Sequence, residues 1–311
     1  MKRLTLRDQG ELYYSISSQN KPRMYLDPGE TVIVETEDAS SGHIRKLTDK
    51  RDYEKVPYSN PQSGPFYING AEKGDTLVVE LLNISPTIGQ GITRLAKWWW
   101  YLGHRESNQA MADFLQPIIP DGLKIMPIKK DIVYFDKLTL PYKPMIGTIG
   151  TAPDLEAIST YLPGHHGGNL DLPCITNGCK LYLPVKVPGA LLHIGDAHAI
   201  QGEGEISSAA VEMPAEVTLK VDLIKNKDLD WPRIENDEYI MSVGCTGVGR
   251  TLEDTIRLAY VNLSRWMEEY GVNRWDAWEL CSLLGKITLG NIWSIAAGFP
   301  KKYLRKIQSS I

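Results

Sequence analysis

The stretch Thr76–Leu82 reads TLVVELL, a run of aliphatic and β-branched residues that follows the turn sequence Lys73-Gly74-Asp75. A short apolar run bounded by glycine is typical of a buried β-strand. Similar runs recur along the chain, separated by glycine, proline, asparagine and aspartate. They are Thr31–Thr36 (TVIVET), Lys180–Val187 (KLYLPVKV), Leu191–Ile194 (LLHI), Ile206–Met213 and Val217–Leu223 (VTLKVDL). Strands of this length and spacing predict a mainly β protein with a multi-stranded β-sandwich or jelly-roll-like body.

The pattern changes after Val243, where apolar residues become spaced by three and four. Thr251 is a suitable cap for a helix that Gly271 would end, and a second helix is expected from near Asn273 to near Gly285. No proline- or serine-rich linker separates these helices from the strands. We therefore expect one large domain over residues 1–311, with a β body over about 1–230 and a helical excursion over about 250–286.

Composition excludes several classes of protein. The 311 residues include 34 Lys plus Arg against 38 Asp plus Glu, for a net charge of −4, and 42% are hydrophobic. These values are ordinary for a globular chain and provide no broad basic face, so we expect no nucleic-acid partner. The start of the chain lacks an uninterrupted apolar stretch, and the aromatic run Lys97–Tyr101 is too short for a membrane span. A cytoplasmic protein without a membrane partner is predicted.

The four cysteines form no C-x-x-C pair, which suits a reducing compartment and disfavours a thiolate zinc site. We expect them to be buried thiols. The role of Trp98–Trp100 stays open between walling a pocket and sealing one end of the sandwich. The remaining tryptophans of the C-terminal region offer apolar surface, so a homo-oligomer is expected.

The densest polar segment is Leu191–Glu205, LLHIGDAHAIQGEGE. In an extended chain alternate residues face the same side, so Asp196 and His198 face together, as a D-x-H metal pair requires. Glu203 and Glu205 form a second pair of this kind. One imidazole with several carboxylates suits zinc, and also calcium or manganese. The alternative is a solvated hairpin end.

Two further polar clusters accompany this segment. In Pro163–Asp171 (PGHHGGNLD), the glycine pair that includes Gly168 would let backbone amides approach a ligand, and Asn169 and Asp171 share an alternating face. Near the N-terminus, the strand TVIVET leads into acidic residues that include Asp38. Carboxylates at strand ends gather at one mouth of a sandwich, although an exposed acidic turn would have the same sequence.

Six motifs in one order make the chain resemble the acetamidase/formamidase family along most of its length. They are VETED…GHI (34–44), GPFYINGAEKGDTLVVEL (64–81), PMIGTIGTAPD (144–154), GGNLD (167–171), KLYLPV (180–185) and GDAHAIQGEGE with the following AVEM (195–213). The resemblance implies a β-rich, metal-dependent cytoplasmic amidase that hydrolyses short amides to ammonia and a carboxylate. It also carries six residues onto the family's polar site: Asp38, Asn169, Asp171, Asp196, His198 and Glu205. Glu203 stands where the family commonly has Asp.

On this hypothesis a metal-activated water attacks the amide. Asp38, Asp196 and His198 hold the metal, with zinc expected and calcium as the alternative. Glu205 moves the proton, with Glu203 as the second candidate for base or ligand. Asn169, Gly168 and Asp171 bind the small amide substrate. The alternatives are another metal-dependent acyl hydrolase, acting on a lactam, cyclic imide or ester, and a non-catalytic β-sandwich that binds a metal or a sugar.

Overall fold

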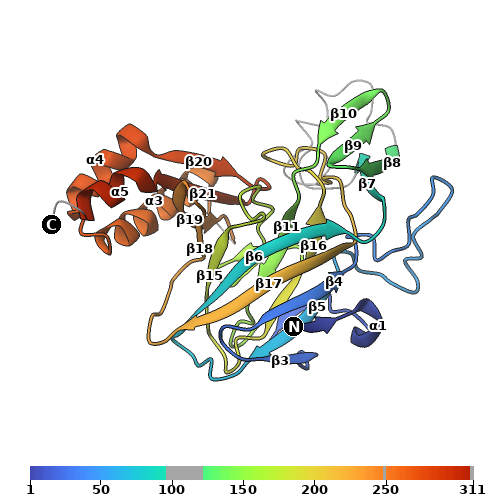
Figure 1. Ribbon diagram of the computed structural model, residues 1–311, viewed down its shortest axis with the longest axis horizontal. Helices are drawn as coiled ribbons and strands as arrows, with labels where there is room; N and C mark the ends of the chain where they lie inside the picture. The colour runs from blue at the N-terminus through green and yellow to red at the C-terminus, as the bar shows by residue number, and fades with distance from the viewer. Residues whose placement is uncertain (96–121, 248–249, 309–311) are drawn as a thin grey trace.

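The computed structural model describes residues 1–95, 122–247 and 250–308 (Figure 1). Trp98–Trp100 lie outside the described residues. In the described part, strands form a nine-stranded, a six-stranded, a four-stranded and a two-stranded sheet, and the C-terminal helices gather at one end of the β body (Figure 1). The predicted mainly β fold with C-terminal helices is confirmed.

The nine-stranded sheet contains most of the strands predicted from sequence. Its order is β1 (Lys2–Leu4), β4 (Thr31–Thr36), β17 (Ala215–Ile224), β6 (Thr76–Pro86), β15 (Lys180–Pro184), β18 (Arg233–Glu235), β19 (Tyr239–Cys245), β21 (Ser294–Pro300) and β20 (Lys286–Leu289). β1 runs parallel to β4, and the other pairs are antiparallel. Strict alternation of buried and partly exposed residues along β4 shows that one face of this sheet is buried.

The six-stranded sheet supplies the frame of the site. Its order is β13 (Pro163–Gly164), β14 (Gly167–Asn169), β11 (Met145–Gly150), β16 (Leu192–His198), β5 (Gln62–Ile68) and β3 (Met24–Leu26). Every residue of β11 and β16 is buried. One hydrophobic cluster joins side chains of this sheet, such as Phe66 and Ile149, to side chains of the first, such as Val79 and Leu219. The two sheets therefore pack as a sandwich.

Two smaller sheets and four helices complete the described elements. The four-stranded sheet has the order β10 (Leu138–Pro141), β9 (Ile132–Phe135), β8 (Gly122–Lys129) and β7 (Gln90–Leu95), and the two-stranded sheet pairs β12 (Ala157–Ser159) with β2 (Ser15–Ser17). The helices are α1 (Leu6–Gln9), α3 (Leu252–Glu268), α4 (Arg274–Leu284) and α5 (Lys301–Gln308).

The predicted helices form where their caps and apolar spacing place them. The Thr251 side chain accepts a hydrogen bond from the Asp254 amide at the start of α3, and Asn273 caps α4. The buried face of α3, which includes Leu263 and Trp266, packs on β19 and β21 in a hydrophobic cluster separate from the sandwich core. The helical layer therefore covers the end of the large sheet that is remote from β1 (Figure 1).

One predicted strand is wrong. Ile206–Met213 forms turns and a single bridge residue, Glu212, instead of a strand. Glu205 and Ser208 have positive φ values of 45° and 59°, and a turn joins the Ser208 amide to the Glu205 carbonyl. A left-handed backbone at two places cannot continue a strand. The segment instead folds back so that Glu212 bridges both Ile92 and His198.

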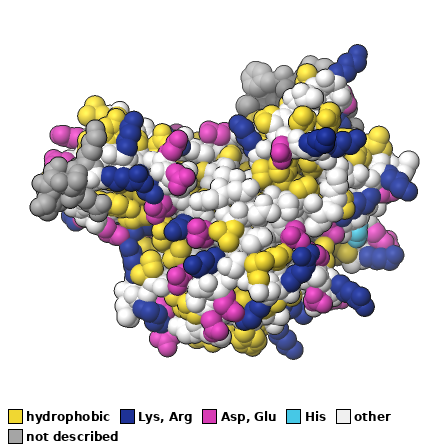
Figure 2. Space-filling view, viewed as in Figure 1, with side chains coloured by type: hydrophobic (Ala, Val, Ile, Leu, Met, Phe, Trp, Pro, Cys, Tyr) yellow, Lys and Arg dark blue, Asp and Glu magenta, His cyan; other side chains and the backbone are white. Residues whose placement is uncertain are grey.

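Lysine and arginine side chains are interspersed with acidic ones over the face drawn in Figure 2. The described helices include none that is both long and apolar enough to cross a membrane. All four cysteines are free, three of them buried and Cys174 half-buried, as expected. On α4, Trp275 and Leu283 expose 71% and 76% of their surface. The expected homo-oligomer stays a prediction.

Candidate functional site

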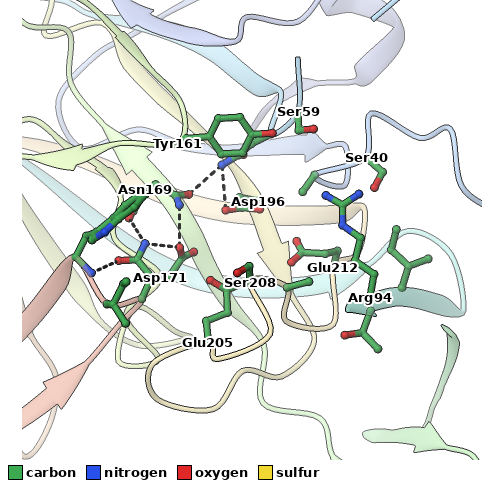
Figure 3. A pocket seen from close by; sticks show the side chains of 18 residues that line it. Ser40, Ser59, Arg94, Tyr161, Asn169, Asp171, Asp196, Glu205, Ser208 and Glu212 are labelled. Carbon is green, nitrogen blue, oxygen red and sulfur yellow. Dashed lines mark hydrogen bonds between the residues drawn. The ribbon is translucent and has the colours of Figure 1, made fainter. Parts of the chain in front are cut away.

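A small cavity of about 60 Å³ lies beside the six-stranded sheet. Its lining residues come from segments far apart in sequence: Ala39, Ser40, Ser59, Asn60, Ile92, Thr93, Arg94, Tyr161, Asn169, Asp171, Asp196, Glu205, Ser208, Ala209, Glu212, Asn291, Ile292 and Trp293. Figure 3 shows the carboxylates of Asp171, Asp196, Glu205 and Glu212 around one space. This cavity has room for a small organic molecule.

β11 and β16 bring two of these carboxylates together. Asp196 lies on β16, and the Asp171 amide donates to the carbonyl of Gly147 on the neighbouring β11, at 3.0 Å. A Cβ atom on Gly147 would lie 2.6 Å from Asp196 Oδ2 and closer still to Asp171 Oδ1. Only glycine at this position lets both carboxylates approach the strand.

His198 stands at the centre of the acidic group. Its Nε2 lies 3.1 Å from Glu212 Oε2 and 3.4 Å from Asp196 Oδ1. Its Nδ1 lies 2.9 Å from Gln201 Oε1, while Gln201 Nε2 donates to the Asp171 carbonyl. Because Gln201 Oε1 can only accept, the proton of a neutral His198 is on Nδ1 and the Nε2 lone pair faces the carboxylates. This is the arrangement of a metal-binding histidine and its outer partner.

Three buried atoms of the cluster, Asp171 Oδ1, His198 Nε2 and Glu212 Oε2, make no hydrogen bond of regular geometry with the described residues. Two of them, His198 Nε2 and Glu212 Oε2, lie within ion-pair distance of each other. Ligand atoms of Asp171, Asp196 and His198 lie within 4.8 Å of one another, and so do those of His198, Glu205 and Glu212. Buried polar atoms are normally paired, so such atoms in two groups that share His198 fit a cation bound beside this histidine. A donor set of one imidazole and several carboxylates fits a divalent metal such as zinc.

Electrostatics favour positive charge at the same point. Burial and the Asp196 charge raise the pKa of Asp171 to about 7, and burial also raises the pKa values of Glu205 and Glu212. Burial alone would lower the pKa of His198, but the charges of Glu212 and Asp196 outweigh it and raise that pKa well above its ordinary value. Buried carboxylates so close together either take up protons, as the raised pKa values show, or share a positive charge, which protonated His198 or a bound metal would supply.

A buried amide network holds the carboxylates in place. Asn60 Nδ2 lies 2.9 Å from Asn169 Oδ1 and 3.2 Å from Asp196 Oδ2. Asn169 and Asn291 each donate through Nδ2 to Asp171 Oδ2, at 2.9 and 2.8 Å. Asn291 lies between β20 and β21, so the C-terminal part of the chain completes the site.

The backbone is unusual at four residues of the cavity wall. Asn60, Asp171, Asp196 and Glu205 have φ values of 60°, 45°, 60° and 45°, in the left-handed region that residues other than glycine rarely adopt. Asparagine and aspartate tolerate this region better than glutamate does. Clustered strain of this kind is typical of functional sites, where the surrounding structure fixes side chains for a task.

Several predicted residues meet in this cavity. Asn169, Asp171, Asp196 and Glu205 line it, and His198 lies directly behind the lining. The alternation that paired Asp196 with His198, and Asn169 with Asp171, therefore identified side chains that are close in space.

Three other predicted residues lie elsewhere. The carboxylate of Asp38 forms an ion pair with Arg45 and accepts the Ser40 amide at 2.8 Å, so it shapes the loop at the cavity rim and belongs to neither ligand group. Glu203 is exposed and accepts the Leu289 amide at 3.4 Å. Gly168 pairs with Ile149 within the sheet and is absent from the lining. Gly168 has a positive φ of 80°, and a Cβ atom there would collide with the Leu162 carbonyl oxygen, so glycine allows these two backbone segments to pack closely.

Sequence reasoning missed Glu212, Gln201, Asn60 and Asn291. Glu212 and Gln201 fall inside quoted motifs, and the expected strand over Ile206–Met213 concealed the role of Glu212. Asn60 and Asn291 had no signal of their own, because only the folded chain brings them to residues more than one hundred positions away.

By its fold and its site, this protein is a β-sandwich protein with a buried histidine–carboxylate centre in a small cavity. Residues 19–161 and 154–284 match the sequence profile of the Acetamidase/Formamidase family, so the chain belongs to that family, as the sequence motifs suggested.

Relatives of known structure match almost the whole chain. The crystal structure of an acetamidase from Yersinia enterocolitica is 39% identical, with a TM-score of 0.87 over 97% of this chain and 92% of the other. An acetamidase from Bacillus halodurans is 33% identical, with a TM-score of 0.85 over 98% and 99%. The acetamidase of Mycolicibacterium smegmatis is 28% identical over 64% of this chain and 63% of its own. The match thus spans less than two thirds of that relative's length.

Proposed function

We propose that this protein hydrolyses short primary amides, such as formamide or acetamide, to ammonia and the corresponding carboxylate. The observation that carries the proposal is the pair of possible ligand groups that share the buried His198, one with Asp171 and Asp196 and one with Glu205 and Glu212, beside one small cavity. The names of the related proteins, acetamidase and formamidase, support the substrate class.

The residues that would hold a divalent metal, most simply zinc, are His198 with Asp171, Asp196 and Glu212. When bound, such an ion lowers the pKa of a coordinated water and polarises the amide carbonyl. The Gln201 contact keeps His198 Nε2 directed at the cluster. Asn60, Asn169 and Asn291 hold the carboxylates of Asp196 and Asp171 in fixed orientations.

Glu205 is the proposed general base. It lines the cavity on the loop that precedes Glu212, and its side chain faces the same space as those carboxylates (Figure 3). Its carboxylate would accept a proton from the attacking water and then deliver that proton to the leaving nitrogen, so that ammonia departs as a neutral molecule. Glu205 thus gains one proton and loses one proton in each catalytic cycle.

Cavity size supports short substrates. A space of about 60 Å³ accommodates formamide or acetamide, whereas a long acyl chain would need the wall to move. We expect turnover to fall as the acyl chain is lengthened from acetamide to hexanamide.

The test is ammonia release from formamide and acetamide by purified protein, measured before and after treatment with a chelator and after zinc is added back. We expect the untreated protein to release ammonia, the chelator to abolish this activity, and added zinc to restore it. His198→Ala should remove both bound metal and activity while circular dichroism stays unchanged, because the large core does not depend on this side chain.

His165→Ala is the matched control, because this neighbouring histidine belongs to neither ligand group and should leave metal content and activity intact. Full activity in chelator-treated protein would refute the proposal that the activity depends on a metal. Absence of ammonia release from every amide, with ester or lactam cleavage in its place, would refute the amidase assignment.

A further inference from the structure

Arg94 is a cationic side chain on the wall of the cavity, on the side where Glu212 lies (Figure 3). It lies on β7, where the amide and carbonyl of Ile92 each bond Glu212 at 2.8 Å. Three consecutive residues of this strand, Ile92, Thr93 and Arg94, line the cavity. Arg94 thus lies two residues, about 6.6 Å, along the strand from the point where Glu212 is anchored.

The guanidinium of Arg94 is half-buried and has no hydrogen bond or ion pair among the residues that the structure describes. Other half-buried arginines differ: Arg45 is paired with Glu37 and Asp38, and Arg233 with Glu269. Figure 3 shows the Arg94 guanidinium between Glu212 and Ser40, facing the space in front of Asp196. A half-buried guanidinium on a cavity wall, with five donors and no acceptor, suits an anionic ligand.

The shape of the cavity limits what that ligand is. Guanidinium binds a planar carboxylate through two parallel hydrogen bonds. A small cavity excludes nucleotides and other large anions. The carboxylates of the histidine–carboxylate centre would repel a substrate carboxylate unless a metal is present, whereas they do not repel a neutral amide.

We propose that Arg94 forms a carboxylate subsite, and that the preferred substrates are monoamides of short dicarboxylic acids, with the amide at the His198 centre and the free carboxylate at Arg94. This inference rests on the proposed amidase function and narrows it. Because the cavity is small, we expect one or two methylene groups between the amide and the carboxylate, as in malonamate and succinamate.

The test compares kcat/KM for each anionic amide with that for a neutral amide of similar size: malonamate with propionamide, and succinamate with butyramide. The wild-type protein should favour the anionic member. A bidentate charged contact contributes about 1.5–3 kcal/mol, so Arg94→Gln should reduce the anionic-to-neutral ratio by about 10- to 100-fold, mainly through KM. Arg94→Lys keeps the positive charge but lacks the two parallel N–H donors of the guanidinium, so its anionic-to-neutral ratio of kcat/KM should lie between those of the wild type and Arg94→Gln.

Arg257→Gln is the control, because it removes an arginine whose guanidinium pairs with Asp254 on the exposed surface of α3. This variant should keep the wild-type ratio. A wild-type preference for the neutral amides, or the same ratio in Arg94→Gln and the wild type, would overturn the subsite while leaving the amidase function in place.

A binding measurement separates the subsite from the amidase function. Succinate, the product expected from succinamate, should bind the metal-loaded wild-type protein in a calorimetric titration about 10- to 100-fold more tightly than it binds Arg94→Gln. Arg94-dependent succinate binding without turnover of any amide would support the subsite and refute the amidase function. If the protein neither binds succinate through Arg94 nor turns over any amide, the subsite and the amidase function are both refuted.

Discussion

Asn291 provides a sharp test of how the site is built, because it reaches the acidic cluster from the far end of the chain. Its Nδ2 donates to Asp171 Oδ2 at 2.8 Å and lies 3.0 Å from the Asn169 carbonyl, while its Oδ1 accepts the Trp293 amide at 2.9 Å. Its side chain is buried. Ser294 Oγ also donates to Oδ1, at 3.3 Å, so Asn291→Ala removes four hydrogen bonds and leaves the Asp171 and Ser294 partners buried.

Asn291→Ala should lower both the folding stability of the protein and its affinity for zinc. A hydrogen bond to a carboxylate contributes about 1.5–3 kcal/mol, and Asp171 Oδ2 keeps its second donor, Asn169. We therefore expect the free energy of unfolding of the metal-free protein to fall by about 1–3 kcal/mol, measured by urea denaturation. Zinc affinity should fall by about 10- to 100-fold, as is typical when an outer partner of a ligand is removed.

The measurement is competition for zinc between the protein and a chromophoric chelator. Asn83→Ala is the control, because Asn83 is an exposed asparagine on β6 whose Nδ2 contacts Ser85 at 3.4 Å. It should keep wild-type zinc affinity. A folded Asn291→Ala protein that binds zinc as tightly as the wild type would refute the idea that this residue orients Asp171.

Three further changes test other parts of the account. Gly147→Ala should reduce zinc affinity at least about 10-fold in the same competition assay, because the added Cβ would lie 2.6 Å from Asp196 Oδ2. Glu205→Gln should lower turnover by about 10²-fold or more while metal content, measured by elemental analysis, is retained; loss of the metal would make Glu205 a ligand instead. Burial alone would raise the pKa of Asp75, but hydrogen bonds, first that from Lys225, lower it. A lowered pKa in the folded state stabilises the protein above the unfolded value of about 3.9, and this stabilisation is lost as pH falls through the lower folded value. Asp75→Asn should therefore cost about 1–3 kcal/mol in urea denaturation at pH 7 and less below about pH 4, and a cost independent of pH would contradict this.

The sequence predicted the parts of the fold and site that depend on local pattern. Alternation and turn residues identified β4 at its observed bounds, and capping residues placed α3 and α4. The two-residue spacing paired Asp196 with His198 because both belong to one strand, β16.

Contacts between distant segments could not be predicted in this way. Asp38 matched an acidic motif, but its carboxylate found a partner in Arg45, seven residues further on, and a single sequence does not show which cation a carboxylate will pair with. Glu212 was missed because apolar neighbours made its segment look like a strand, whereas left-handed turns at Glu205 and Ser208 redirect it toward the cavity.

The most direct test of the central claim is a crystal structure of the zinc-loaded protein with data collected across the zinc absorption edge. The account predicts an anomalous difference peak about 2.0–2.1 Å from His198 Nε2, with carboxylate oxygens from the group Asp171, Asp196 and Glu212 completing the ligand shell. The absence of a peak in this cavity, or a peak at the acidic cluster around Asp38 instead, would contradict it.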